Sequence, residues 1–157
     1  SWLPTVMVNA VQTNALKNYW KNWTRLRNAV YVTYPYARSA SKVIQSVNAE
    51  LAGVQDEKLR KQIIKSREKE LKREFADKVT SLSVYQGKVL MKLINRETGN
   101  NCYQLIKEYK GGLNAGLWQT VAFVFGSSLK QPYSPNGDDQ EIEKLVLEVQ
   151  KVYGIKG

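Results

Sequence analysis

Histidine is missing from the 157-residue chain, and Cys102 is its only cysteine. Without an imidazole, the chain has no neutral base with a pKa near neutrality, so a serine or cysteine nucleophile activated by histidine is excluded. One thiolate also falls short of the nitrogen and sulfur ligands that zinc sites use. We therefore expect no metal site, no cofactor and no assignable catalytic residue. Chemistry by paired carboxylates, as in glycosidases, stays open.

Long apolar runs are missing as well. The best one, residues 121–125, is far shorter than the roughly 20 residues of a spanning helix, so we expect no transmembrane segment. Cys102 cannot form a disulfide within the chain, so the cysteine content leaves the compartment open. The chain starts at Ser1-Trp2 without an initiator methionine, and we expect an N-terminal segment, such as a signal peptide, to have been removed.

Positive charge is in excess. The 24 lysines and arginines against 14 acids give a formal net charge of +10, and the isoelectric point is near 9.7. Such a surplus predicts attraction to anions, including nucleic acid, acidic glycans and anionic lipid headgroups, but it does not choose among them. The length fits a single domain with a real core.

The N-terminus predicts a short extended arm. Residues 3–8 are prone to form a strand and carry Pro4 at the start, where a strand tolerates proline. A lone strand has no partner for its backbone groups, so the segment would be a loose arm or add to another sheet edge. We divide the chain into an extended arm over residues 1–13 and a helical domain over residues 14–157.

The first helix is predicted from Asn14 to about Gly53. Apolar residues recur there every seven positions, a pattern typical of a long helix. They are Leu16, Trp23, Val30, Ala37, Ile44 and Leu51. Pro35 removes a backbone donor and crowds the previous turn, so a kink or break is expected near residues 34–36.

The remaining apolar periodicities also predict helices. A charged helix over residues 55–78 should pair with the first as a helical hairpin, since its apolar stripe is narrow. Further helices are expected over residues 82–97, 102–110 and 113–125, and a last one, capped by Asp138 or Asp139, through Val152. The fold class is mainly α, a single-domain helical bundle. An extended hairpin over residues 89–106 stays open as an alternative.

The densest polar segment, residues 86–107, is the predicted site. Lys88, Lys92 and Arg96 recur every four residues and should line one side of a helix that Gly99 ends in the left-handed conformation. Replacing all three by glutamine should abolish anion binding and leave stability nearly unchanged if the row is a binding surface. In the alternative interpretation, Arg96 stabilises the helix end or pairs with a carboxylate. The candidate binding residues are Lys88, Lys92, Arg96, Glu97, Tyr103, Lys107 and Gln119.

Several short motifs occur in a fixed order along the chain. They are Tyr34-Pro35-Tyr36-Ala37, Gln86-Gly87, Lys92-Leu93-Ile94, Arg96-Glu97-Thr98-Gly99, Tyr103 with Leu105-Ile106-Lys107, Trp118-Gln119, Phe125-Gly126, Leu129-Lys130 and Tyr133. This series resembles an uncharacterised bacterial family, the domain of unknown function numbered 4294. The resemblance implies an exported protein of the periplasm or cell envelope, since members of the family generally begin with a signal peptide. It implies no reaction.

Three functions remain open. The first is a non-catalytic interaction or scaffolding module of the cell envelope, bound to a protein partner. The second is a binder of anions or glycans, such as an anionic envelope polymer, that uses the basic helix face and nearby aromatic rings. The third is a carboxylate-based hydrolase centred on Glu97, with Tyr103 or Lys107 nearby. The sequence disfavours a nucleic-acid partner, because core packing is the favoured interpretation of the aromatics among residues 19–25.

Overall fold

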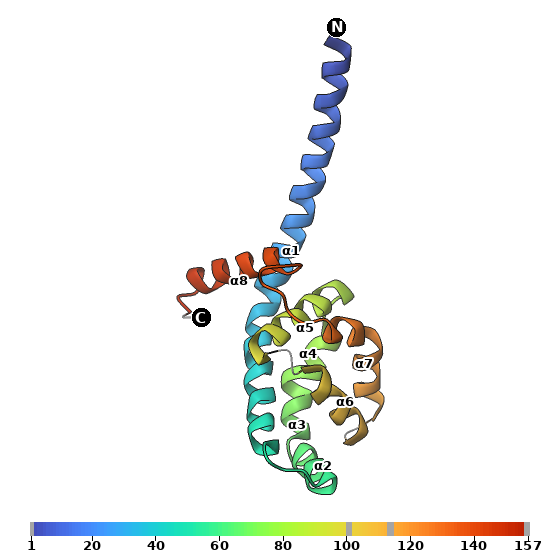
Figure 1. Cartoon of the computed structure of the whole chain (residues 1–157), viewed down its shortest axis with the longest axis vertical. Helices are drawn as coiled ribbons and strands as arrows, with labels where there is room; N and C mark the ends of the chain where they lie inside the picture. The colour runs from blue at the N-terminus through green and yellow to red at the C-terminus, as the bar shows by residue number, and fades with distance from the viewer. Residues whose placement is uncertain (1, 100–101, 113–114, 156–157) are drawn as a thin grey trace.

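The computed structural model describes the backbone of residues 2–99, 102–112 and 115–155, and the side chains of residues 13–99, 103–109 and 118–155. Every regular element in these ranges is a helix, which confirms the predicted fold class (Figure 1). The extended hairpin considered for residues 89–106 is wrong, because α5 (Val84–Thr98) and α6 (Cys102–Gly112) lie there.

Helix α1 (Trp2–Leu51) would measure about 75 Å at 1.5 Å per residue. From Val30 onward its predicted apolar positions are buried, including Ala37, Ile44 and Leu51. The helix continues on both sides of Pro35, so the predicted long helix is confirmed and a break at this proline does not occur. The side chains of residues 13–22 are exposed, and Figure 1 shows this part of α1 projecting beyond the other helices.

The extended conformation predicted for the N-terminal arm is wrong from Trp2 onward, since the backbone there is helical. Pro4 does not oppose this conformation. It lies in the first turn, where the amide hydrogen that proline lacks would have no partner within the helix. The division of the chain at residue 14 stays a prediction.

The chain returns along α1 in four short helical pieces. These are α2 (Glu57–Ser66), α3 (Glu68–Leu71), the π-helical turn η1 (Lys72–Ala76) and α4 (Asp77–Ser81). We predicted a single helix over residues 55–78, but the helix is interrupted at Arg67, whose φ of −103° and ψ of 8° are not helical. The Arg67 guanidinium pairs with Glu50 of α1 and with Glu70. The predicted charged hairpin is therefore present, with a break in its second arm.

Helix α5 ends at Gly99 as predicted, and it begins at Val84, two residues after the predicted start. Ser83 and Gln86 form a capping box at the first turn, and Gly99 ends the helix with a φ of 68°. The buried face of α5 packs against α1, α6 and α7. At Gly87 the helix meets α7 so closely that an added Cβ would lie 2.5 Å from the Phe125 ring.

Two C-terminal helices complete the body. Helix α7 (Ala115–Lys130) buries Trp118, whose ring stacks on Phe75 at 5.6 Å between centroids. We predicted this helix over residues 113–125, but α7 continues through Gly126 to Lys130. Helix α8 (Gln140–Val152) crosses α1, and a buried hydrogen bond from Gln150 to the Tyr34 hydroxyl at 2.9 Å joins the two.

A pair of glycine substitutions tests the contact between α5 and α7. Gly87→Ala should lower the free energy of unfolding by about 1–3 kcal/mol, because the new methyl group would overlap the Phe125 ring. Gly126→Ala is the matched control within a helix, since no atom lies within 4 Å of its added Cβ. It should stabilise by up to about 1 kcal/mol through helix propensity. Thermal unfolding of both variants checks this, and a stabilised Gly87→Ala protein would contradict the close packing.

Candidate functional site

The seven candidate residues fall into separate places. Lys92, Arg96 and Glu97 lie on α5 beside the segment that leads into α8. Tyr103, Lys107 and Gln119 line a groove between α6 and α7. Lys88 is exposed on α5 and belongs to neither place. The structure therefore divides the predicted polar site into an ion-pair cluster and an open groove.

Arg96 is the centre of the ion-pair cluster. Its guanidinium donates to both carboxylate oxygens of Glu143, from Nε at 2.8 Å and from Nη2 at 2.9 Å. The remaining nitrogen, Nη1, donates to Glu97 at 2.8 Å. The Tyr133 hydroxyl donates to the same Glu143 carboxylate at 2.6 Å. This bidentate geometry is the strong form of an arginine–carboxylate pair, and it connects α8 to α5.

Lys92 makes a second link of the same kind, one helical turn earlier. Its ammonium lies 3.2 Å from Oδ1 of Asp139, whose side chain is buried. Asp139 also accepts a hydrogen bond from the backbone amide of Ser134 at 2.9 Å. We predicted Asp138 or Asp139 as the cap of the last helix. Asp139 does stand at the N-cap position, but its carboxylate makes no capping hydrogen bond, because it is used by Lys92 and Ser134.

The cluster shifts the pKa values of its members. The hydrogen bonds from Arg96, followed by the one from Tyr133, hold the pKa of Glu143 below its usual value against the opposing effect of burial. Burial, followed by the bond to Glu143, raises the pKa of the Tyr133 hydroxyl. Glu143 thus stays ionised and Tyr133 stays a neutral donor at neutral pH.

These contacts bear on whether the row of Lys88, Lys92 and Arg96 can bind an external anion. The sequence shows no acid between the three cations, but the fold brings Asp139 and Glu143 to Lys92 and Arg96. The structure favours the alternative interpretation for Arg96, which pairs with a carboxylate, and it pairs Lys92 in the same way. The Glu97 carboxylate is paired with Arg96 and does not line the groove between α6 and α7, so this geometry lends no support to a hydrolase centred on Glu97.

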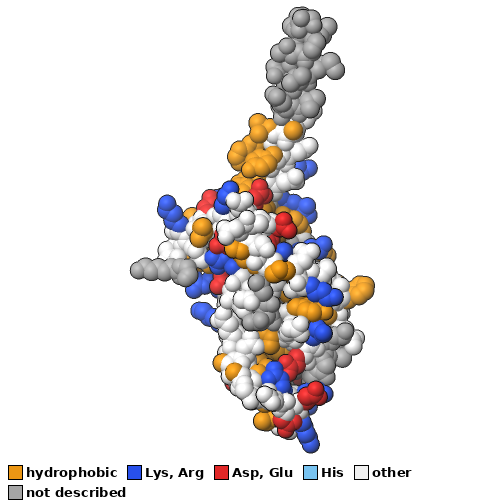
Figure 2. All heavy atoms as spheres, in the orientation of Figure 1, with side chains coloured by type: hydrophobic (Ala, Val, Ile, Leu, Met, Phe, Trp, Pro, Cys, Tyr) orange, Lys and Arg blue, Asp and Glu red, His pale blue; other side chains and the backbone are white. Residues whose placement is uncertain are grey.

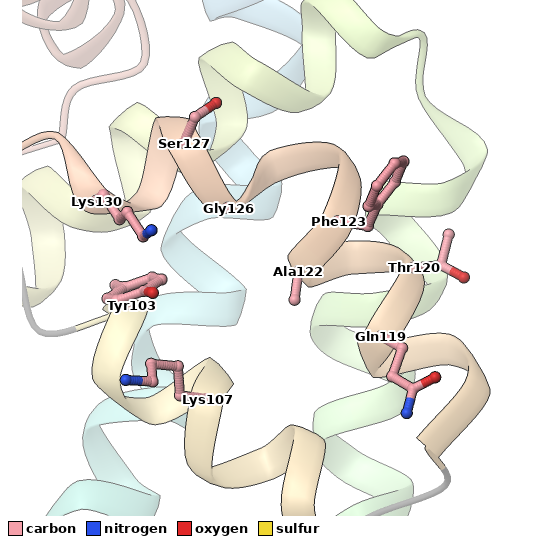
Figure 3. Close-up of a pocket in the computed structure, with 9 residues that line it drawn as sticks. All are labelled: Tyr103, Lys107, Gln119, Thr120, Ala122, Phe123, Gly126, Ser127 and Lys130. Atoms are coloured by element: carbon pink, nitrogen blue, oxygen red, sulfur yellow. The ribbon is translucent and has the colours of Figure 1, made fainter.

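The groove between α6 and α7 is open and has a volume of about 790 Å³. Tyr103 and Lys107 line it from α6, and Lys130 lines it from α7 (Figure 3). The Nζ atoms of Lys107 and Lys130 lie 5.5 and 5.4 Å from the centroid of the Tyr103 ring, within reach of a cation–π interaction. Among the described residues, neither ammonium group forms an ion pair with an acid.

The α7 wall of the groove carries polar groups and an unusually exposed ring. Gln119, Thr120 and Ser127 supply amide and hydroxyl groups, and Phe123 is 91% exposed. An aromatic side chain left in water gives up the free energy that its burial would contribute. Of the residues on this wall, Gln119 was predicted from the sequence, but Lys130, Phe123 and Ser127 were not. The groove joins residues from two helices, and no local pattern predicts how these helices lie relative to each other.

The ion-pair cluster makes a prediction about stability. Arg96→Gln should lower the free energy of unfolding by about 2 kcal/mol, because charge-assisted hydrogen bonds to Glu143 are lost. For a chain of this length the melting temperature should fall by roughly 4–8 °C. Lys88→Gln removes the same charge from an exposed position of the same helix and should change stability by less than about 0.5 kcal/mol. Equal melting temperatures for the two variants would remove the structural role of the cluster.

The lowered pKa of Glu143 predicts a dependence of stability on acid. A carboxyl group whose pKa is lower in the folded state stabilises the protein above its unfolded pKa of about 4.3. This contribution is lost as the pH falls through the folded pKa. The wild type should therefore exceed Glu143→Gln in melting temperature near neutrality, and the difference should narrow below about pH 4. A difference that stays constant across this range, measured by thermal unfolding, would contradict the assignment.

Within the part of the chain that the structure describes, no helix has the length and apolar character to cross a membrane. In the same residues, no group of three or more acidic or cysteine side chains is placed to hold a metal ion.

Comparison with known proteins identifies the family and gives no activity. No curated protein and no solved structure matches the chain. The sequence model described as Domain of unknown function (DUF4294) matches residues 1–148, so the chain belongs to this family.

Proposed function

We propose that the protein is a non-catalytic binding protein that holds an anionic glycan in the groove between α6 and α7. The observation that carries the proposal is the pair of ammonium groups, Lys107 and Lys130, on either side of the Tyr103 ring. The described acids form no ion pair with them, so both remain available to a carboxylate or phosphate of a ligand.

The rest of the groove suits a sugar chain better than a small compact anion. Phe123 presents an exposed ring to which the C–H face of a sugar can stack, while Gln119 and Ser127 can bond hydroxyl groups. Lys107 also lines a neighbouring hollow of about 620 Å³, next to Arg60 and Glu108. An extended polymer could therefore continue past α6, which an isolated pocket would not permit.

The cellular location is part of the same proposal. An anionic polysaccharide is a typical component of the bacterial envelope, and the family resemblance implies export to the periplasm or envelope. The formal charge of +10 supports association with such a polymer. A scaffolding role toward a protein partner is compatible with this location, but the groove offers charge and hydroxyl ligands rather than a broad apolar interface.

Titration calorimetry with a carboxylated polysaccharide, polygalacturonate, tests the groove. The wild type should bind it and should bind more weakly as salt is added, while the neutral polysaccharide dextran should not bind. Lys107→Gln combined with Lys130→Gln should weaken binding by at least roughly 30-fold, because two charge-assisted contacts are lost. Phe123→Ala should weaken binding and leave the melting temperature unchanged, since the ring is almost fully exposed.

A charge-matched control separates the groove from the net charge. Lys65 and Lys69 are exposed on α2 and α3, outside the groove, and the double glutamine variant removes the same two charges. This control should bind polygalacturonate within about twofold of the wild type if the contacts are local. Equal loss in both double variants would show that only net charge matters, and unchanged binding in the groove variant would exclude this site.

A further inference from the structure

The projecting part of α1, residues 13–22, exposes large apolar side chains that no other described element covers. Leu16, Tyr19 and Trp20 are 57%, 50% and 54% exposed. Figure 2 shows hydrophobic side chains gathered on one side of α1 where it leaves the body. We predicted that the aromatics of this segment pack in the core. That is wrong for Tyr19 and Trp20, while Trp23 is half-buried against the core.

The spacing makes this segment amphipathic. Tyr19, Trp20 and Trp23 follow Leu16 by three, four and seven residues, which places them on one side of a helix. Lys17, Lys21 and Arg25 follow one another by four residues and lie on the opposite side. The projecting segment thus has an apolar aromatic face and a basic face.

The charge of α1 is one-sided. Its first acidic residue is Glu50, so residues 1–49 contain basic side chains and no carboxylate. Two of these cations have partners in the body, since Arg27 pairs with Glu148 and Arg25 lies over the Tyr85 ring. Lys17 and Lys21 form no ion pair among the described residues. They lie on the outer part of the segment, where a partner outside the chain can reach them.

We infer that residues 13–22 of α1 dock on an anionic lipid bilayer. Lysine and arginine on one face with tryptophan, tyrosine and leucine on the other are typical of helices that lie in a membrane interface. Aromatic rings favour the headgroup level, and each basic side chain near an anionic surface adds attraction. A second copy of the chain is a poorer occupant, because two segments without acids would bring like charges together in either orientation.

An open hollow lies along the surface of the same segment. It has a volume of about 890 Å³ and is lined by Lys21, Arg25, Thr24, the amide side chains Asn18, Asn22 and Asn28, and Trp20 of the apolar face. Amide and ammonium donors around one hollow suit the phosphate oxygens of a lipid headgroup. In this arrangement the apolar face would enter the interface while Lys17 and Lys21 contact the headgroups, so the segment would lie along the bilayer surface.

Sedimentation of the full chain with lipid vesicles tests the inference. The protein should bind vesicles made of equal parts phosphatidylcholine and phosphatidylglycerol, and not vesicles of phosphatidylcholine alone. Lys17→Gln with Lys21→Gln should weaken the partitioning roughly 30-fold, because the attraction of two charges is lost. The triple serine variant of Leu16, Tyr19 and Trp20 should weaken it at least roughly tenfold. These side chains are exposed, so circular dichroism should show an unchanged fold.

Matched variants and a second readout make the outcome decisive. The double glutamine variants of Lys65 with Lys69 and of Lys107 with Lys130 should bind vesicles within about twofold of the wild type, which separates this surface from the glycan groove. Leu59→Ser, an exposed leucine of α2, is the apolar control. In a Trp2→Phe background, brominated phosphatidylglycerol should quench Trp20 and Trp23 and leave the buried Trp118 bright.

Three results would overturn the inference. The first is equal binding to both kinds of vesicle, and the second is equal loss in all the double lysine variants, which would reduce the effect to net charge. The third is sedimentation of a dimer that the triple serine variant abolishes, without any binding to vesicles. That result would assign the apolar face to a second copy of the chain. None of these results bears on polygalacturonate binding, which uses other residues.

Discussion

The packing of α5 against the C-terminal half of α1 is the constraint on which the rest of the structure depends. Helix α5 buries residues on most of its surface, and every other part of the body is placed by a contact with one of these two helices. Gly87 lets α7 approach α5 at the Phe125 ring, and α7 forms one wall of the groove. Lys92 and Arg96 draw the residues before and within α8 onto the same helix. Because the interior is densely packed, a displacement of α5 would also displace α7 and α8.

The distribution of carboxylates determines which cations can act on other molecules. Asp139 pairs with Lys92, and Glu143 pairs with Arg96. Both carboxylate oxygens of Glu108 accept hydrogen bonds from Arg60, and this pair joins α6 to α2. Such part-buried pairs are directional and hold elements together, at a cost in desolvation. The cations without an ion-pair partner among the described acids include Lys107 and Lys130 of the groove and Lys17 and Lys21 of the outer part of α1, and also exposed residues such as Lys65 and Lys88 on the body. Positive charge that the fold does not neutralise is therefore available on several surfaces.

Sequence periodicity predicts the helices well and the contacts between them poorly. The seven-residue repeat of α1 matches burial from Val30 to Leu51, and Gly99 marks the end of α5 as predicted. The same repeat fails at Leu16, because periodicity predicts which face is apolar and not where the body ends. The pairing of Arg96 with Glu143 spans 47 residues, and the pairing of Arg60 with Glu108 spans 48. Contacts of this range depend on how helices pack, so local spacing could not show that Lys92 and Arg96 are structural links while Lys88 of the same row is exposed.

The projecting segment of α1 has an energetic weakness that its proposed role explains. Residues 13–22 are exposed, so the helix there rests on propagation from the packed turns after Ala29 and on the intrinsic propensities of its residues. Propagation adds little free energy per residue, whereas burying one apolar face against a second phase adds much more. Contact of Leu16, Tyr19 and Trp20 with a lipid interface would thus stabilise the helix as well as attach it. The docked helix would then hold the body, with the groove between α6 and α7, at a fixed distance from the lipid surface.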